Sequence, residues 1–382
     1  MAKQSEVKYR SSRSARRLVR QVFLSLIFLA TVMLWAIRTN SRDYENQRVL
    51  ALQETPYFRS LQNSQELLRP AKNISVNLVV ASVRADDITW TSHISNIPNL
   101  RVVRYVWDDS SAPYHPTKKR GNEAMMYHTY LHDFYDKLPD MSIFIHAHDM
   151  SWHTEPYLFS SLQYAVSHLD LDQVLQRQYV NLRVGWQNAC PAWIKTNISK
   201  ERDPQKPEQV HMHQAFREIF SSKSKTPAVP EILAQPCCSQ FAVSKAAIQS
   251  VSKTDYAHYI EWLSATDLSD NLSGRVWEHL WQYLFTRKAV DCPVAWKALC
   301  RTYHICFDNA QDLEAFMQLE YEKEWLIFGR SFWKELWDPE SAARGRQRVH
   351  NINEAMGKQL SMALDRGKYP SWRNAVGDLY LD

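Results

Sequence analysis

Glycine is scarce in this chain, with only 8 glycines in 382 residues. No G-x-G-x-x-G and no G-x-x-x-x-G-K-[ST] motif occurs, which excludes the glycine-rich phosphate loops of dinucleotide-binding and P-loop proteins. H-E-x-x-H, G-x-S-x-G and C-x-x-C are absent too, so a zincin, an α/β-hydrolase and a structural zinc site are disfavoured. The chain is 45% hydrophobic with 14 Trp, a composition typical of a folded protein rather than a disordered one.

Basic charge is concentrated at the start of the chain. Residues 1–20 contain seven Lys or Arg and a single acidic residue, Glu6, which more than accounts for the formal net charge of +5. The rest of the chain is close to neutral and has no dense Lys and Arg cluster of the kind that binds a phosphate backbone. We therefore expect no nucleic acid among its partners.

Only one long uncharged run occurs, the sixteen residues Val22–Ile37. A helix of this length spans about 24 Å, which fits a thin early-secretory bilayer if the flanking residues contribute. Because the basic residues precede it, the positive-inside rule predicts a cytosolic tail (1–20), a single transmembrane signal anchor (21–38) and a luminal body, hence a type II protein of the Golgi or ER membrane. A cleaved signal peptide is the alternative, but the run is long for one and lacks a small-x-small cleavage site.

Sequons and cysteines agree with a luminal body. Asn73, Asn197 and Asn271 each begin an N-x-S triplet, although single triplets often arise by chance. All six cysteines follow the anchor, and their even number permits disulfides in an oxidising lumen, with a pairing that the sequence does not reveal. We expect the adjacent Cys237 and Cys238 to pair elsewhere or to pack, rather than to bridge each other.

The body is predicted to have three parts: a polar stem (39–74), an α/β domain (75–306) and a helical extension (307–382). Apolar, β-branched runs at 76–82, 101–107 and 141–147 predict buried strands. Apolar residues at three-to-four spacing predict a helix over 122–138, ended by Leu138-Pro139-Asp140. This alternation indicates an α/β fold, with a Rossmann-like, mainly parallel sheet and crossover helices.

Polar residues follow each predicted strand, at the edge where open α/β sheets bind ligands. We assign Asp108 and Asp109 to a nucleotide, although turn formation is the plainer role for any one Asp. His146, His148 and His153, with Asp149, form a candidate set of ligands for a divalent ion, Mn or Mg. The alternatives are a core histidine at 146, a helix cap at 153, or imidazoles that bind an anion or a sugar. Asp170-Leu171-Asp172 has D-x-D spacing but lies in a predicted helix.

Two further segments supply candidate site residues. The start of the 122–138 helix offers groups for a nucleotide cofactor: Lys119, Arg120, Asn122 and Glu123. The segment Gly274–Phe285 reads as an aromatic helix whose apolar residues are mostly core. Glu278 is its acidic residue and a candidate catalytic base, whereas a surface pair with His279 is the plainer interpretation.

An ordered set of motifs is similar to a fungal family of unknown function, DUF3431. The motifs run from the first strand to the Cys-Pro near residue 292, and they are Lys119–Ala124, Tyr127–Leu131, Ile143–His148, Ser151–His153, Cys238–Ser244 and Gly274–Trp281. Asp149 stands where similar proteins have a basic residue. The layout also resembles glycosyltransferases of the GT-A kind: an anchor, a stem, a Rossmann-like half with a polar motif after a mid-sheet strand, and a Gln-Phe-x-Val segment. Fold likeness alone does not fix function.

The leading hypothesis is a luminal glycosyltransferase-like domain that transfers a sugar from a nucleotide donor to a glycan or small-molecule acceptor. Glu278 would be the base, and His146 and His148 would act at the diphosphate, either directly or through the ion. One alternative is a metal-dependent hydrolase or tailoring enzyme of fungal secondary metabolism, with His146, His148 and His153 as ligands. Another is a non-catalytic carbohydrate-binding module with a Trp-rich surface.

Overall fold

The computed structural model describes residues 73–380, apart from residues 98, 152, 201–202, 223–226 and 329–336, and also 23, 25–27 and 30–31. Among these residues, no helix combines the length and the apolar character needed to cross a membrane. The predicted tail (1–20), most of the predicted anchor (21–38) and nearly all of the predicted stem (39–74) lie outside the described residues. Those three assignments stay predictions.

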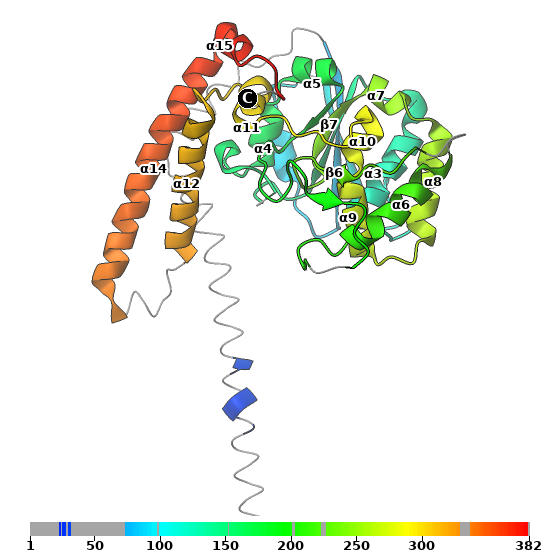
Figure 1. Ribbon diagram of the computed structural model, residues 1–382, viewed down its shortest axis with the longest axis horizontal. Helices are drawn as coiled ribbons and strands as arrows, with labels where there is room; N and C mark the ends of the chain where they lie inside the picture. The colour runs from blue at the N-terminus through cyan, green and yellow to red at the C-terminus, as the bar shows by residue number, and fades with distance from the viewer. Residues whose placement is uncertain are drawn as a thin grey trace, which may run out of the picture. The chain divides into compact units, whose positions relative to one another are not determined.

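A five-stranded, mostly parallel sheet lies at the centre of the α/β part (Figure 1). Its strand order is β2 (Asn99–Val106), β1 (Ser75–Ser82), β3 (Met141–His146), β7 (Phe241–Ser244) and β4 (Tyr179–Asn181). β1 pairs in parallel with both β2 and β3, whereas β7 runs antiparallel to both β3 and β4. The three strands predicted from the sequence are confirmed within two residues at each end.

The first crossover helix, α3 (Asn122–Asp133), is shorter than the predicted helix over 122–138. Its last predicted turn tightens into a 3-10 helix, η3 (Tyr135–Lys137), before Pro139. α3 packs against β1, α8 (Lys253–Ala265) and α9 (Asp270–Glu278) on one side of the sheet. In Figure 1, α4 (Leu162–Ser167) and α5 (Leu171–Arg177) lie on the other side. The sheet is thus covered on both faces, as its continuously buried strands require.

Short elements make up the rest of the α/β part. Asp170 caps α5, because its Oδ1 accepts a hydrogen bond of 2.8 Å from the Gln173 amide, so only Asp172 of the D-x-D pair lies in the predicted helix, in its first turn. The remaining elements are η2 (Thr89–His93), η4 (Pro156–Leu158), β5 (Ile194–Lys195), η5 (Gln209–His211), α6 (Met212–Ile219), η6 (Phe220–Ser222), β6 (Ile232–Leu233), α7 (Lys245–Gln249), α10 (Trp281–Thr286) and α11 (Ala295–Tyr303).

The predicted aromatic helix over 274–285 is two helices, α9 and α10, separated by His279 and Leu280. The assignment of its apolar residues to the core is confirmed, because Trp277 and Trp281 are fully buried. Gly274 allows a close approach: a Cβ there would lie 3.2 Å from the carbonyl oxygen of Gly121, next to the start of α3. The end of α9, which carries Glu278, is thereby held beside the α3 N-terminus.

The C-terminal part is helical, with α12 (Ala310–Phe328), α14 (Pro339–Gly367) and α15 (Pro370–Ala375). The chain divides into two compact units, one of Met1–Phe58 with Leu319–Glu354 and one of Arg59–Gln318 with Ala355–Asp382. Within the first, Arg348 forms a two-pronged ion pair with Glu322. Within the second, the Cys306 amide donates to the Ala363 carbonyl oxygen at 2.9 Å, so the end of α14 belongs to the α/β unit.

All six cysteines form disulfides, in the pairs Cys190–Cys292, Cys300–Cys306 and Cys237–Cys238. The expectation that Cys237 and Cys238 do not bridge each other was wrong. Adjacent cysteines bridge here because the backbone is not extended: Cys238 has a φ of +91°, in the left-handed region that side chains usually avoid.

Candidate active site at the carboxyl edge of the sheet

Four strands end, and β7 begins, at the same edge of the sheet. The register places Phe241, the first residue of β7, opposite Phe144 of β3 and Asn181 of β4. The residues just before β7 therefore lie beside those just after β3 and β4. Because β7 is reversed, the edge also receives the segment that leads into a strand, which a purely parallel sheet would place at the opposite edge.

The polar residues after β1 and β2 form one set of contacts, which we call the outer polar group (Arg84, Asp86, Asp108, Asp109 and His148). Asp108 accepts from the Arg84 amide at 2.6 Å, and the Arg84 guanidinium lies 2.9 Å from an Asp109 oxygen. Hydrogen bonds from Ser111 and then Arg84 lower the pKa of Asp109 to about 2. The two acids that we assigned to a nucleotide are thus bound to a neighbouring basic residue, and their role with a nucleotide stays a prediction.

His148 belongs to this outer group rather than to the other two histidines. Its side chain is 72% exposed, and its Nε2 lies 3.5 Å from an oxygen of Asp86. His146 and His153 do meet, with ring centroids 5.0 Å apart. Burial lowers the pKa of His146 to about 4 and that of His153 to about 3, so both rings are neutral at physiological pH.

The proposed ion-binding set is not assembled by the described residues. Asp149 is used to order the start of α4, because its carboxylate accepts from the Ser161 hydroxyl and the Gln163 amide at 2.8 and 2.7 Å. Within the described part of the chain, the only group of His, Cys, Asp or Glu close enough to share an ion is Cys237, Cys238 and Glu278. Mn²⁺ and Mg²⁺ favour oxygen ligands, and sulfurs joined in a disulfide are not thiolates. These residues do not fit the expected metal, and no step is assigned to one.

Two glutamates form the centre of what we call the inner polar group (Glu123, Glu278, Ser239 and the Cys237–Cys238 disulfide). Burial raises the pKa of Glu123, at the start of α3, and a hydrogen bond with Ser239 opposes this. Burial also raises the pKa of Glu278, at the end of α9, and the nearby charge of Glu123 adds to the effect. Among the described residues, neither carboxylate forms an ion pair with Lys or Arg. We call Glu123 and Glu278 the acid pair.

Glu278 is held from two directions. Its Oε1 accepts a hydrogen bond of 2.9 Å from the backbone amide of Cys238. Its own carbonyl oxygen accepts a hydrogen bond of 2.7 Å from Gln235, which in turn accepts from the Tyr179 hydroxyl. A carboxylate fixed through both backbone and side chain is preorganised, which suits a group that exchanges a proton with a bound substrate.

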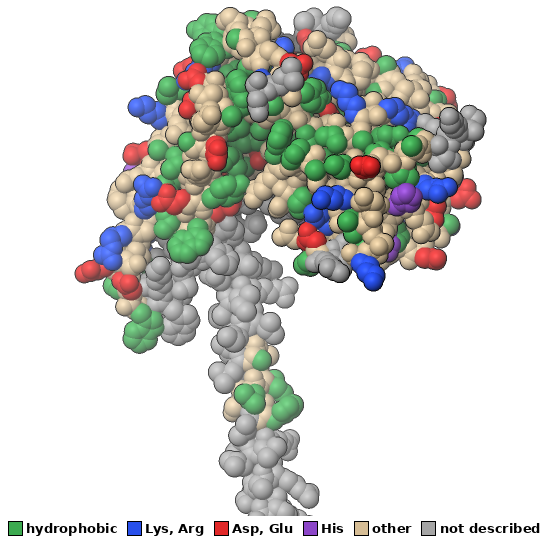
Figure 2. Space-filling view, in the orientation of Figure 1, with side chains coloured by type: hydrophobic (Ala, Val, Ile, Leu, Met, Phe, Trp, Pro, Cys, Tyr) green, Lys and Arg blue, Asp and Glu red, His purple; other side chains and the backbone are tan. Residues whose placement is uncertain are grey.

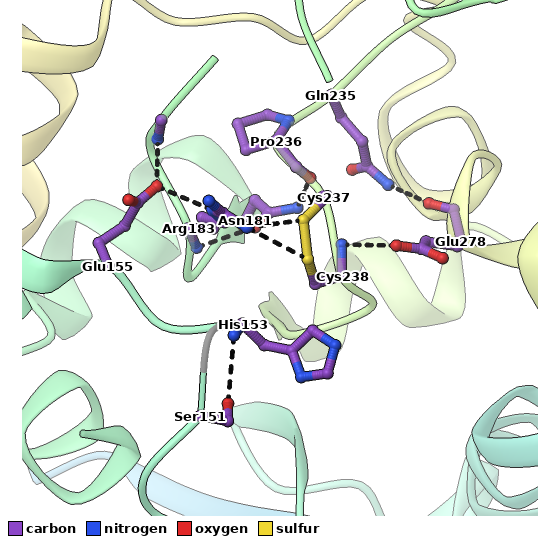
Figure 3. The surroundings of a disulfide bond; sticks show 11 residues. Ser151, His153, Glu155, Asn181, Arg183, Gln235, Pro236, Cys237, Cys238 and Glu278 are labelled. Carbon is purple, nitrogen blue, oxygen red and sulfur yellow. Dashed lines mark hydrogen bonds and ion pairs between the residues drawn. A yellow bond between two sulfur atoms is a disulfide. The ribbon is translucent and has the colours of Figure 1, made fainter. Parts of the chain in front are cut away.

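The disulfide lies between Glu278 and the ion pair of Arg183 with buried Glu155 (Figure 3). Sulfur atoms of both cysteines lie within 4.8 Å of a Glu278 oxygen. On the other side, Nη1 of Arg183 lies 3.0 Å from Cys237 Sγ and 3.5 Å from Cys238 Sγ, and Nε donates to Glu155 at 2.9 Å. Glu155 is 2% exposed and also accepts from the Gly185 amide, where an added Cβ would lie 2.3 Å from its carboxylate.

The predicted nucleotide-binding residues at the start of α3 lie in different environments. Arg120 donates to the carbonyl oxygens of Thr266 and Leu268 and lies 3.3 Å from Asp270, so it fixes the connection between α8 and α9. Lys119 and Asn122 are exposed, whereas Glu123 belongs to the acid pair. On the face of the molecule seen in Figure 2, basic and acidic side chains are interspersed.

Sequence reasoning found Glu278 and Glu123 but missed the residues around them, Arg183, Glu155 and Ser239. The adjacent cysteines were the one visible signal, and they were interpreted the wrong way. Nothing in the local pattern around Glu155 or Arg183 distinguishes them from surface residues, because their burial depends on segments nearly 30 residues apart meeting at the edge.

Together these features describe a mixed α/β protein with a partly buried acid pair at the carboxyl edge of a mostly parallel sheet. The family model DUF3431, a protein family of unknown function, matches residues 78–301, which is more than half of the chain. The chain belongs to the DUF3431 family, as its motifs indicated. No curated protein and no solved structure matches it.

Proposed function

We propose that this chain is a glycosyltransferase-like enzyme that moves a sugar from a nucleotide donor to a glycan or small-molecule acceptor at the acid pair. The observation that carries the proposal is the pairing itself: Glu123 and Glu278 are partly buried near each other at the carboxyl edge of the sheet, and desolvation raises the pKa of each. Carboxylates with a purely structural role usually form an ion pair with a basic side chain or are exposed to solvent. Titratable groups kept in an unfavourable environment next to each other are typical of acid–base catalysis.

In this reaction, Glu278 accepts the proton of the acceptor hydroxyl. The hydroxyl oxygen forms a bond to the anomeric carbon, and the bond from that carbon to the diphosphate oxygen breaks, so the electron pair leaves with the nucleoside diphosphate. A carboxylate with a raised pKa is a stronger base than an exposed one, which favours this proton transfer. Glu123, the other member of the pair, holds a proton to higher pH than an exposed Glu and can donate it in a hydrogen bond to a donor-sugar oxygen.

The arrangement of strands supports sugar transfer over other acid–base reactions. The polar segment after the mid-sheet strand β3 lies beside the Gln240-Phe241-x-Val243 segment of β7, and Gln240 accepts a hydrogen bond of 3.2 Å from the His146 amide. This is the juxtaposition that the resemblance to GT-A glycosyltransferases implies. It is an argument from fold analogy and ranks below the acid pair. His146 and His148 were expected at the diphosphate; because they lie apart and the His146 ring is neutral, we assign the leaving diphosphate to exposed Lys119 instead.

Two observations support a luminal location, in the Golgi or ER, behind a type II anchor. The three sequon asparagines, Asn73, Asn197 and Asn271, are exposed, so their side chains are open to a glycosylating enzyme. The three disulfides join all six cysteines, which suits an oxidising compartment.

The test measures nucleoside diphosphate release from a panel of nucleotide sugars by the full-length chain, with Mn²⁺ or with a chelator. We expect turnover of at least one donor, and a loss of about 100-fold or more in Glu278→Gln and Glu123→Gln. The matched control is Glu261→Gln on the exposed face of α8, which should keep full activity. Sugar binding without turnover would instead favour a carbohydrate-binding module. Turnover retained in both acid-pair variants would refute the assignment.

A further inference from the structure

Two consecutive residues beside the acid pair have left-handed backbone conformations. Cys238 has a φ of +91° and Ser239 a φ of +50°, and neither is glycine. Such conformations are disfavoured for residues with a Cβ, and they persist only where the surroundings impose them. We call these two residues the left-handed bend.

The left-handed bend donates a hydrogen bond to one member of the acid pair and lies next to the other. The Cys238 amide donates to Glu278 Oε1 at 2.9 Å. The next residue, Ser239, lowers the pKa of Glu123 through its hydroxyl, which also accepts from the Trp281 indole at 3.3 Å. The conformation of the bend thus decides whether the Cys238 amide points at Glu278.

The disulfide is the constraint that holds this conformation. Bridging two adjacent residues closes a small ring that contains their peptide bond, so rotation about the backbone of Cys237 and Cys238 is restricted. Arg183 anchors the ring from outside through its contacts with both sulfurs, and buried Glu155 fixes Arg183 in turn. The chain has no glycine in this segment that would adopt a positive φ without such a constraint.

We propose that the Cys237–Cys238 disulfide is a conformational clamp that positions Glu278 through the Cys238 amide, and that breaking it disables the acid pair. The two cysteines are positioning residues, since they act on the reacting groups through Glu278. The proposal rests on the proposed function for its effect on turnover, but its effect on Glu278 does not depend on that function.

The clamp also implies sensitivity to dithiols. A dithiol reduces the disulfide with two electrons: the sulfur–sulfur bond breaks, each sulfur gains a proton to become a thiol, and the dithiol closes to its own disulfide. The left-handed bend can then relax to an extended backbone. The Cys238 amide is lost as a donor to Glu278, whose remaining titratable neighbours are Glu123 from α3, Arg275 from α9 and His279 just after α9.

The decisive comparison uses two double variants of the full-length chain. Cys237→Ala with Cys238→Ala removes the clamp and leaves a residue that avoids positive φ. Cys237→Ala with Cys238→Gly also removes both sulfurs, but glycine adopts a φ near +90° without strain. Cys300→Ala with Cys306→Ala is the control, because it removes a disulfide elsewhere in the chain.

The first measurement is an infrared pH titration of the protonated carboxyl band that disappears in Glu278→Gln. An amide hydrogen bond favours the charged form, so losing it should raise the midpoint by about one pH unit in the Ala double variant. The midpoint of the Gly double variant should rise by less than half as much, and that of the control should not change.

The second measurement is steady-state kinetics with the best nucleotide sugar of the panel. We expect kcat to fall about tenfold or more in the Ala variant and to recover in the Gly variant, with KM little changed.

Several results would overturn the clamp. One is an unchanged titration midpoint in a folded Ala double variant. Another is an equal shift of the midpoint in the Ala and Gly variants, since the sulfur atoms and not the backbone conformation would then set the pKa of Glu278. A rise in KM alone would indicate a sugar-stacking surface instead. If the Ala variant does not fold, the same titration on wild-type protein reduced with dithiothreitol replaces it, and an unchanged midpoint there refutes the proposal. A shifted midpoint with full activity in Glu278→Gln would refute the proposed function and leave the clamp standing.

Discussion

The outer and inner polar groups lie along the same sheet edge and use the same kind of side chain in opposite ways. In the outer group, Arg84 binds Asp108 and Asp109, and hydrogen bonds hold the pKa of Asp109 far below its ordinary value. In the inner group, Glu123 and Glu278 are partly buried near each other, and their pKa values are raised. The difference teaches that one sheet edge can neutralise the charge of some carboxyl groups and leave others without a cation, and the latter are the ones to which we assign the proposed reaction.

The sharpest test of this contrast is catalytic. Glu278→Gln should reduce sugar transfer by about 100-fold or more, because the variant has no base for the acceptor proton. Asp109→Asn, an equally small change in the outer group, should cost only a minor fraction of that loss. Steady-state rates with saturating donor measure both. A larger loss of transfer rate in Asp109→Asn than in Glu278→Gln would place the reacting centre in the outer group and contradict the proposed difference between the two groups.

The ion pairs of the two groups should differ in their effect on stability. Glu155 and Arg183 are both almost fully buried, so Glu155→Gln leaves a buried guanidinium without its partner and should lower the free energy of unfolding by about 3 kcal/mol. In the outer pair, the Arg84 side chain is 69% exposed, and Arg84→Gln should cause no resolvable change. Urea unfolding of the two variants at pH 7 gives the comparison. Equal losses would show that burial does not distinguish the pairs.

Glu278→Gln should stabilise the protein while it disables it. A carboxyl group whose pKa is raised on folding stabilises the native state below its unfolded pKa, and this contribution is lost as pH rises through the folded value. At pH 7, the side chain of wild-type Glu278 therefore destabilises the native state, and substitution by glutamine removes this effect. The melting temperature of the variant should exceed that of wild type at pH 7, and the gap should close below about pH 4.5. A variant less stable than wild type at pH 7 would mean that Glu278 is a structural residue.

Asp109 should show the opposite sign and the smallest effect. Its pKa is lowered on folding, so its contribution is present above the ordinary value of 3.8 and is lost as pH falls toward about 2. Asp109→Asn should thus lower the stability slightly at pH 7, where this contribution is fully present, and flatten the acid side of the stability profile between these values. Acid unfolding followed by circular dichroism measures the slope. An unchanged slope would contradict the compensated state of this carboxylate.

The sequence predicted the parallel half of the sheet well, because β1 and β3 are buried on both faces and read as continuous apolar runs, and the run in β2 is rich in valine. It also named Glu278 and Glu123 as candidate site residues, and their roles stay predictions. It did not predict β4, whose three residues are too short for a pattern, or the pairing of β7 in reverse, which depends on contacts between distant segments. The three histidines looked equivalent in the sequence, and only the turn after β3 separates His148 from His146.

The prediction that the adjacent cysteines Cys237 and Cys238 do not bridge each other was wrong for a different reason. A bridge between neighbours needs a backbone conformation that is unfavourable in isolation, so local propensity argues against it. Arg183 and Glu278 contact these cysteines from two other segments, Glu155 holds Arg183 in place, and these contacts stabilise the conformation. Tertiary contacts can therefore override local preference at the place where the acids meet.

The Cys190–Cys292 disulfide closes a covalent loop with a sequence separation of 102 residues, and that loop contains both the clamp and Glu278. A protease that cuts once anywhere inside the loop would sever the backbone without releasing a fragment. Such a nicked chain would migrate as one molecule in a non-reducing gel and as two in a reducing one. Glu123 lies outside the loop, so a cut between Cys190 and Glu278 would leave the two glutamates on different polypeptides, held together by that bond and by packing.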